Sequence, residues 1–296
     1  MRDPDPRLPM QELTNPATAS QITKNEVVRV VNPSVVGDLR LHTFHSRILR
    51  NSRTLRVWLP PGYDDAGNSK RYPVFYLQDG QNLFDTETAF GHTEWQVDET
   101  TDRLIRENVI PPMIVVGIDN MGMERLKEYS PYRSFNPPIF RPLGKRYREF
   151  LVLEVMSFIE REYRIAKGPE NTGIGGSSLG GLISLYTVMA APGVFGKLLV
   201  ESPSLFLAKR QAIKEARKVL DWPFRVYLGI GTAETGDVAK NVQFVNDLNA
   251  LSDIMRRGGL HEQRLRVHIE EGAHHSEGSW ARRFPGALQF LFGKIE

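Results

Sequence analysis

Cysteine is absent from this 296-residue chain. Its absence excludes disulfide bonds, thiolate metal ligands and a cysteine nucleophile, so any covalent catalysis needs another side chain. Long apolar runs are also missing: no stretch reaches about 18 residues, and we therefore expect no membrane-spanning helix. The net charge is small, because 38 basic and 35 acidic residues leave +3. Since the basic residues are scattered, neither nucleic acid nor a membrane is indicated as a partner.

What the composition does contain is ordinary for a globular protein, with 41% hydrophobic and 25% charged residues. A chain of this length suits one large α/β domain. The first residues are polar and contain several prolines, so we expect a loosely ordered lead-in over residues 1–25 and a single domain over residues 26–296. Because the N-terminus lacks an apolar core of signal-peptide length, a cytoplasmic protein is expected.

The strand and helix patterns change along the chain. Short β-type runs at residues 27–31, 41–49 and 54–60, with a turn at 50–53, predict antiparallel strands. From residue 72 onward, strands alternate with helices. Such alternation builds βαβ units, so we predict an α/β fold with a doubly wound, mostly parallel sheet and antiparallel N-terminal strands. The expected strands lie near residues 72–80, 112–119, 171–176, 197–203, 224–231 and 265–272, and the expected helices near 95–108, 147–162, from 179 onward, 208–219, 238–257 and at the C-terminus.

Residues 120–145 interrupt this alternation with a long polar and aromatic stretch. A loop of that length in a compact domain is usually functional. Ligands bind at the carboxyl ends of the strands in a doubly wound sheet, and this stretch directly follows a predicted strand. We interpret it as a wall or lid over the site, with a packed surface excursion as the alternative.

The strongest chemical motif is G-x-S-x-G, formed by Gly176, Ser178 and Gly180 within GIGGSSLGGLISLY. It stands directly between a predicted strand and a predicted helix, which is the context of the nucleophile elbow in the α/β-hydrolase fold. So sharp a turn needs residues without side chains two positions before and after the serine. We predict that Ser178 is a nucleophile and that the N–H of Leu179 is one oxyanion donor. Ser177 lacks the flanking glycines, and a glycine-rich turn with an incidental serine is the structural alternative.

A serine nucleophile needs an imidazole that accepts its proton. In α/β-hydrolases this histidine follows the last strand. Here that loop is EGAHHSEGSW, which offers His274 and His275 side by side. The pattern alone does not separate the two.

The acid and the second oxyanion donor are expected in two other loops. The acid should follow the strand FRVYLGIG, where Glu234 lies closer to the strand end than Asp237. Its carboxylate would orient the histidine and stabilise its protonated form. The loop after YPVFYLQDG should supply the second oxyanion donor through the backbone N–H of Gly80 or Gln81.

Three further side chains are candidates for the substrate pocket. Trp95 and Trp280 are placed to line an acyl or aromatic pocket, and core packing is an equally favoured role. Arg125 could meet a carboxylate or phenolate of the substrate, but a structural pair with Glu128 is the favoured interpretation.

Seven segments between about Asp38 and the C-terminus together match a known family in order and spacing. They are LRVWLPPGYD, YPVFYLQDGQNLFD, RLKEYSP, GIGGSSLGGLISLY, VFGKLLVESPSLF, GTAE and HSEGSWARRFPGALQFLFG. These segments resemble the esterase D and enterochelin-esterase-like family of the α/β-hydrolase superfamily. The resemblance implies a Ser–acid–His triad without a large cap. It favours His275 over His274, because HSEGSW is similar to the family's histidine element, and it implies Glu234 as the acid. Because members act on varied esters, it also implies a small-molecule ester as substrate.

Ester hydrolysis through an acyl-enzyme is the leading functional hypothesis. The same triad could pass the acyl group to an alcohol or sugar, which would make the protein an acyltransferase. A non-catalytic binding protein on the same fold is a third and less favoured hypothesis, because every triad position holds a competent residue. No metal is expected, since the histidines lack H-E-x-x-H spacing, and no cofactor is needed.

Overall fold

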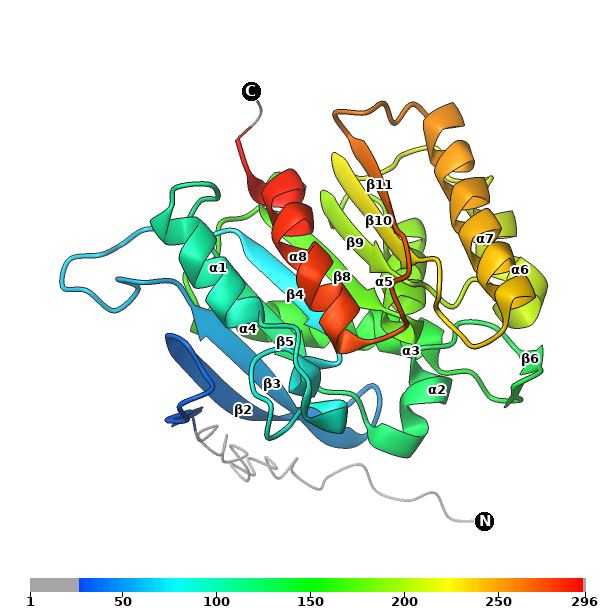
Figure 1. Cartoon of the computed structure of the whole chain (residues 1–296). Coiled ribbons are helices and arrows are strands. Elements are labelled where there is room, and N and C mark those ends of the chain that lie inside the picture. The colour runs from blue at the N-terminus through cyan, green and yellow to red at the C-terminus, as the bar shows by residue number, and fades with distance from the viewer. Residues whose placement is uncertain (1–26, 295–296) are drawn as a thin grey trace, which may run out of the picture.

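Figure 1 shows the computed structural model of the chain, which describes residues 27–294. The predicted lead-in over residues 1–25 lies outside this range. A nine-stranded sheet forms the centre, in the order β1-β2-β3-β5-β4-β8-β9-β10-β11. Its strands are β1 (Val27–Arg29), β2 (Asp38–Ser46), β3 (Asn51–Leu59), β4 (Val74–Gln78), β5 (Ile114–Ile118), β8 (Thr172–Ser177), β9 (Lys197–Glu201), β10 (Arg225–Gly231) and β11 (Leu265–Glu270). The main helices are α1 (Val97–Arg106), α3 (Gly144–Glu149), α4 (Met156–Glu162), α5 (Leu179–Ala190), α6 (Leu207–Ala216), α7 (Val238–Arg257) and α8 (Glu277–Phe292).

The strand directions agree with the predicted fold class. β1, β2, β3 and β5 pair antiparallel to one another in turn. β5, β4, β8, β9, β10 and β11 are all parallel. The strand order reverses at β4, which lies between β5 and β8, and such a switch point opens a crevice at the carboxyl ends of the strands.

β4 shows how helices cover both faces of the sheet. All five of its residues are buried, as expected for a strand that is covered on both sides. Successive side chains point to opposite faces. Phe75 and Leu77 join the core with α1 and α8, whereas Val74 and Tyr76 join the core with α4, α5, α6 and α7. Figure 1 shows α1 and α8 together in front of the sheet. Within residues 27–294, none of the helices has the length and apolar content needed to cross a membrane.

The hairpin between β2 and β3 turns earlier than predicted. The sequence indicated a turn at 50–53, but β2 ends at Ser46, and Ser46 pairs with Asn51 at the start of β3. The carboxylate of Glu154 holds this turn, because it accepts the hydroxyl of Ser46 at 2.6 Å and the N–H of Arg47 at 2.9 Å. Glu154 lies more than a hundred residues away along the chain, so local turn propensity could not reveal this contact.

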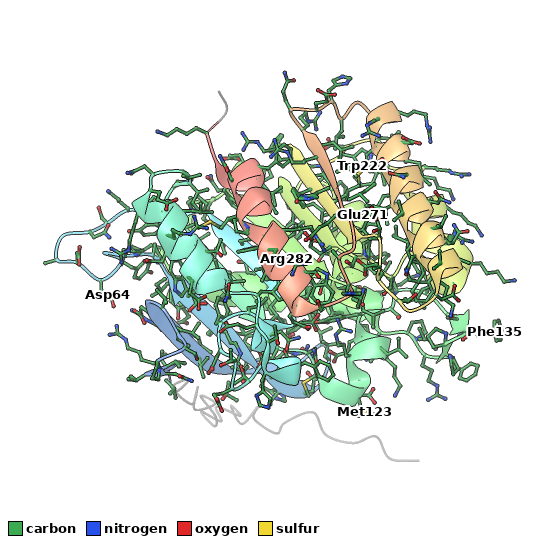
Figure 2. The ribbon with its side chains drawn as sticks, in the orientation of Figure 1. Asp64, Met123, Phe135, Trp222, Glu271 and Arg282 are labelled. Carbon is green, nitrogen blue, oxygen red and sulfur yellow. The ribbon has the colours of Figure 1, made fainter. Side chains whose placement is uncertain are left out.

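Residues 120–145 carry short elements of their own. They contain a 3-10 turn at Gly122–Glu124, the single-turn helix α2 (Arg125–Glu128) and a two-stranded hairpin of β6 (Ser134–Phe135) and β7 (Pro138–Ile139). α3 begins at Gly144, before the predicted start at residue 147, and continues through a π-helical turn at Phe150–Val155 into α4. Met123 and Phe135 project outward from this segment (Figure 2). A lid function of residues 120–145 stays a prediction.

Candidate active site

Ser178 occupies a sharp turn between β8 and α5. β8 ends at Ser177 and α5 begins at Leu179. Ser178 has φ 57° and ψ −120°, a conformation that is strained for a residue with a side chain. Its N–H donates a hydrogen bond to the carbonyl oxygen of Glu201 at 2.8 Å. This bond ties the turn to the end of β9.

The glycines on either side of Ser178 are required by close packing. A Cβ on Gly176 would lie 2.9 Å from the carbonyl carbon of Gly180 and 3.0 Å from Cβ of Gln78. A Cβ on Gly180 would lie 3.0 Å from Cβ of Gln78 and 3.0 Å from a carboxylate oxygen of Asp79. These distances are short for a Cβ atom at either position. The backbone of the turn therefore packs directly against the end of β4.

His275 and Glu234 meet at the carboxyl ends of the last two strands. Glu234 follows β10, and His275 lies in the loop between β11 and α8. Nδ1 of His275 lies 2.5 Å from Oε2 of Glu234. His275 and Ser178 line the same pocket. Because Nδ1 is engaged by Glu234, Nε2 is the ring nitrogen that can serve a reacting group.

The competing acid and histidine lie in other environments. The carboxylate of Asp237 caps α7, where it accepts the N–H groups of Ala239 at 3.0 Å and Lys240 at 3.2 Å. The exposed ring of His274 has its Nδ1 2.9 Å from the carbonyl oxygen of Ala233. Asp237 therefore serves as the cap of α7, and His274 contacts the backbone of the neighbouring loop.

Glu234 is a buried carboxylate with several hydrogen-bond donors, and its side chain is only 1% exposed. Burial acts to raise its pKa, but hydrogen bonds from His275, from the hydroxyl of Ser202 and from the N–H of Gly231 outweigh burial and hold the pKa below its usual value. The carboxylate is therefore charged at neutral pH. A charge at this position can orient an imidazole and stabilise its protonated form.

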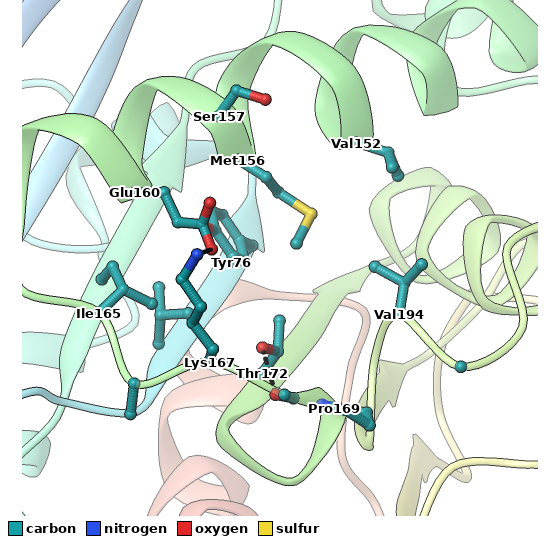
Figure 3. Close-up of a pocket in the computed structure, with 14 residues that line it drawn as sticks. Tyr76, Val152, Met156, Ser157, Glu160, Ile165, Lys167, Pro169, Thr172 and Val194 are labelled. Atoms are coloured by element: carbon teal, nitrogen blue, oxygen red, sulfur yellow. Dashed lines mark hydrogen bonds and ion pairs between the residues drawn. The ribbon is translucent and has the colours of Figure 1, made fainter.

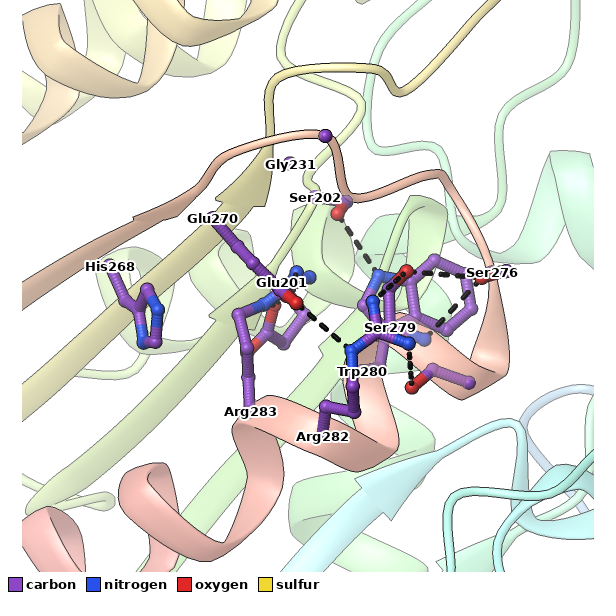
Figure 4. Close-up of polar contacts among 12 residues, drawn as sticks. Glu201, Ser202, Gly231, His268, Glu270, Ser276, Ser279, Trp280, Arg282 and Arg283 are labelled. Atoms are coloured by element: carbon purple, nitrogen blue, oxygen red, sulfur yellow. Dashed lines mark hydrogen bonds and ion pairs between the residues drawn. The ribbon is translucent and has the colours of Figure 1, made fainter.

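Ser202 is a residue of this site that the sequence analysis missed. It directly follows β9, and its hydroxyl donates to Oε1 of Glu234 at 2.7 Å. The indole N–H of Trp280 donates to the same hydroxyl at 3.0 Å, as Figure 4 shows. The ring of His275 packs edge-on against Trp280, with centroids 5.0 Å apart. The available signal was the segment VESPSLF, because its serines follow a strand at the edge of the sheet where the site lies.

An ion pair lies beside this chain of contacts. Arg283 of α8 donates to one carboxylate oxygen of Glu201 at 2.9 and 2.7 Å, and to Glu270 at 2.7 Å (Figure 4). The side chains of Arg283 and Glu201 are both 1% exposed. Burial raises the pKa of Glu201 to about 7 despite the guanidinium. The pair fixes α8 against β9, and so it fixes the helix that follows His275.

The loop after β4 contains the predicted second oxyanion donors. Asp79 has a left-handed backbone, with φ 58°, and a 3-10 turn follows at Gly80–Asn82. A Cβ on Gly80 would lie 2.6 Å from the carbonyl carbon of Gly117, so this turn sits directly on β5. The first N–H groups of a helical turn have no partner within that turn. The N–H groups of Gly80 and Gln81 are of this kind.

Arg125 lines the pocket, but its predicted pairing with Glu128 is wrong. The guanidinium of Arg125 donates to both carboxylate oxygens of Asp79 at 2.7 Å each, and Asn120 donates to the same carboxylate at 2.6 Å. Glu128 instead pairs with Arg53 of β3 at 2.8 Å, where both side chains are buried. The prediction considered neighbours along the chain, whereas both partners come from distant strands and loops.

The pocket at Ser178 has a volume of about 500 Å³. Trp280 contributes to its wall, whereas Trp95 is 3% exposed and packs behind Trp280 with ring centroids 5.6 Å apart. Trp95 therefore belongs to the core and supports the wall from behind. The lining residues are Asp79, Gln81, Asn82, Phe90, Asn120, Gly122, Arg125, Ser177, Ser178, His275, Glu277 and Trp280.

Three acidic residues at the start of α1 are the candidates for holding a metal ion. Among residues 27–294, one oxygen from each of Glu94, Asp98 and Glu99 lies within 4.8 Å of the others. Burial and the neighbouring carboxylates raise the pKa of Glu94 to about 8 and that of Asp98 to about 9. Protons therefore neutralise part of this cluster at neutral pH. None of the three residues lines the Ser178 pocket.

A second cavity, of about 250 Å³, is shown in Figure 3, and its lining residues place it at the opposite end of the sheet. Val74 and Thr172 line it, and they are the first residues of β4 and β8. An ion pair between Lys167 and Glu160, at 3.5 Å, borders this cavity. Its lining contains no histidine, so it lacks the base that a serine nucleophile needs.

The sequence profile of the family described as "Putative esterase" matches residues 46–291, and the chain belongs to this family. Together with the mostly parallel sheet and the turn at Ser178, this match defines the class of the protein: it is a carboxylic ester hydrolase of the α/β-hydrolase fold. The family resemblance noted in the sequence is therefore confirmed.

Two relatives and one solved structure are distant in sequence but match over most of their length. The chain is 26% identical over 250 residues to the uncharacterized protein YbbA of Bacillus subtilis, which covers 82% of this chain and 94% of YbbA. It is 28% identical over 223 residues to the ferri-bacillibactin esterase BesA of Bacillus subtilis, which covers 68% of this chain and 71% of BesA. The crystal structure of the BES protein from Bacillus cereus has a TM-score of 0.69 at 19% identity and covers 92% of this chain and 100% of that one.

Proposed function

We propose that the protein hydrolyses small-molecule carboxylic esters through an acyl-enzyme on Ser178, with His275 as general base and Glu234 as its orienting acid. The observation that carries this proposal is the 2.5 Å contact between His275 and Glu234 beside a serine held in a strained turn. BesA, to which the chain is 28% identical, is named as an esterase of ferri-bacillibactin. Its name supports a small-molecule ester as the substrate class.

The proton path follows from the engaged nitrogen. Nδ1–H of His275 donates to the carboxylate of Glu234, so Nε2 accepts the proton of the Ser178 hydroxyl as its oxygen attacks the ester carbonyl. The protonated imidazole then gives that proton to the leaving alcohol, and the acyl group stays on Ser178. Water repeats the sequence: Nε2 takes its proton, the hydroxide attacks the acyl group, and the serine leaves with the proton restored.

The oxyanion is assigned to the N–H of Leu179 and to the N–H of Gly80 or Gln81. Leu179 begins α5, so its N–H has no partner within the helix. Arg125 acts through Asp79 and is a positioning residue: two hydrogen bonds of 2.7 Å fix the carboxylate that precedes Gly80. In this proposal Arg125 holds the loop that supplies the donor and does not bind the substrate.

The proposal is tested by trapping the nucleophile. The intact protein is treated with a fluorophosphonate, and the modified peptide is identified by mass spectrometry. We expect one adduct, on Ser178, and a loss of p-nitrophenyl acetate hydrolysis of about a thousandfold or more in Ser178→Ala.

Ser177→Ala is the matched control, because Ser177 is the adjacent serine and lines the same pocket. This variant should still form the adduct and keep a measurable rate. An adduct on another residue, or hydrolysis that survives Ser178→Ala, would overturn the assignment. Folding of both variants is checked by thermal unfolding.

A further inference from the structure

Acidic side chains outnumber arginine and lysine side chains in the lining of the Ser178 pocket. Besides His275, the charged side chains in this lining are Asp79, Arg125 and Glu277. Both carboxylate oxygens of Asp79 accept hydrogen bonds from the guanidinium of Arg125, so these two charges offset each other. Glu277 is left as a second carboxylate in the pocket wall.

Glu277 has a neutral partner in the structure. The side-chain amide of Asn82 donates to Oε1 of Glu277 at 3.2 Å. Burial raises the pKa of Glu277 and the carboxylate of Asp79 adds to this, whereas the backbone N–H of Glu277, His275 and Arg125 act to lower the pKa. Because burial is the largest effect, the charge of this carboxylate is only partly compensated, and a ligand that brings positive charge or hydrogen-bond donors would stabilise the charged form.

Glu277 connects two sides of the pocket. It begins α8 two residues after His275, and its side chain accepts a hydrogen bond from Asn82, the last residue of the Gly80–Asn82 turn. In the proposed mechanism His275 protonates the leaving oxygen, and the N–H groups of Leu179 and of the Gly80–Asn82 turn receive the acyl carbonyl oxygen. A charged group on a small ester would therefore share this pocket with Glu277.

We propose that Glu277 selects the substrate by charge: the site favours small esters that carry hydrogen-bond donors or positive charge, and it disfavours anionic esters. This inference rests on the proposed function of the same site. The amides of Gln81, Asn82 and Asn120 line the same pocket and add hydrogen-bonding groups that suit hydroxyls.

A purely structural role for Glu277 makes a different prediction. An acid in the first turn of a helix is stabilised by the helix dipole, and its bond to Asn82 links the β4 loop to α8. If that were its only role, replacing Glu277 would change stability or the rate toward all esters equally. A ratio of rates between charged and neutral substrates separates the two roles.

The test uses acetate esters that differ in the alcohol. Acetylcholine, 3,3-dimethylbutyl acetate and the acetate of 3-hydroxypropanesulfonate carry a positive, a neutral and a negative alcohol, and glyceryl monoacetate is compared with propyl acetate. At low salt we expect kcat/KM to fall by about tenfold at each step from cation to neutral to anion, the size expected for one partly solvated charge at close range. Glyceryl monoacetate should exceed propyl acetate.

Glu277→Gln and Glu271→Gln form the matched pair of variants. Both remove one negative charge, but Glu271 is exposed in the loop before His275 and does not line the pocket. We expect Glu277→Gln to reduce the cation-to-anion ratio of kcat/KM by about tenfold or more, and Glu271→Gln to leave it near the wild-type ratio.

The outcomes separate the inference from the proposed function. Wild-type protein that hydrolyses all five esters without regard to charge, or a ratio equally affected by both variants, overturns the role of Glu277 while ester hydrolysis through Ser178 stands. Wild-type protein that hydrolyses none of them, together with no fluorophosphonate adduct on Ser178, overturns the proposed function itself.

Discussion

Ser202 offers a sharp test of how the acid of the proposed triad is held. Its hydroxyl donates to Glu234 at 2.7 Å and accepts the indole N–H of Trp280 at 3.0 Å. Ser202→Ala removes a hydrogen bond to a buried charge, which contributes about 1.5–3 kcal/mol, and leaves the indole N–H without its acceptor, at a cost of about 1–3 kcal/mol. The variant should therefore be less stable, by about 2–4 kcal/mol after partial relaxation.

The same change should alter activity, because the hydroxyl of Ser202 helps to hold the carboxylate that orients His275. With one of its donors gone, the depressed pKa of Glu234 rises toward its usual value, so the carboxylate stays charged at neutral pH. Glu234 contributes stability above its unfolded pKa, and that contribution is lost as pH falls through the folded pKa; Ser202→Ala makes this contribution smaller and moves its loss to higher pH. We expect the looser carboxylate to lower kcat/KM by about 10- to 100-fold at neutral pH.

The assay is kcat/KM for p-nitrophenyl acetate from pH 4.5 to 9, with urea unfolding of the same samples. Ser184→Ala is the control, because Ser184 is fully buried in α5 and its hydroxyl has no hydrogen-bond partner among the described residues. The control should keep the wild-type pH profile. A Ser202→Ala profile that overlays the wild type would refute the reasoning, whatever happens to stability.

Three further variants test the packing described above. Gly180→Ala should fold poorly or lose most activity, since its Cβ would lie 3.0 Å from both Gln78 and Asp79. Circular dichroism measures folding and the fluorophosphonate adduct measures the reactive serine; a variant that forms as much adduct as the wild type contradicts this prediction. Glu128→Gln should cost about 3–5 kcal/mol in urea unfolding, because it leaves the buried charge of Arg53 unpaired; a cost below about 1 kcal/mol would be inconsistent with that pair. Asp98→Asn tests the pKa of Asp98, which is raised to about 9. The free energy of unfolding of the wild type should fall as pH rises from 5 to 9, by at most about 1.4 kcal/mol per pH unit from this group. The variant should show a weaker dependence of this free energy on pH, and an unchanged dependence would exclude Asp98 as the cause.

Sequence predicted well what local chemistry determines. The flanking glycines of Ser178 predicted a strand–turn–helix junction, and the short packing distances at Gly176 and Gly180 explain why glycine suits both positions. The uninterrupted apolar run of β4 predicted a strand covered on both faces, and its side chains do divide between two cores. Alternation of strands and helices then sufficed for the fold class.

The sequence did not reveal contacts between distant segments. The partner of Arg125 is Asp79, from the loop after β4, and the partner of Glu128 is Arg53, from β3. Ser202 stands in an ordinary segment at the end of a strand. Its hydroxyl becomes part of the site because the fold brings Glu234 and Trp280 within hydrogen-bonding distance. Periodicity and spacing contain no information on which of many polar residues will meet across the sheet.

The dependence of the site on α8 has a consequence for the newly made chain. The chain leaves the ribosome from its N-terminus, and a domain generally folds as a unit. β4, β8 and the Ser178 turn all precede β11 and α8. His275 stands just before α8, and Arg283 docks that helix on Glu201. A nascent chain that lacks this unit has the proposed nucleophile without its proposed base, so under the proposed mechanism ester hydrolysis would begin only after the last described helix has emerged and docked.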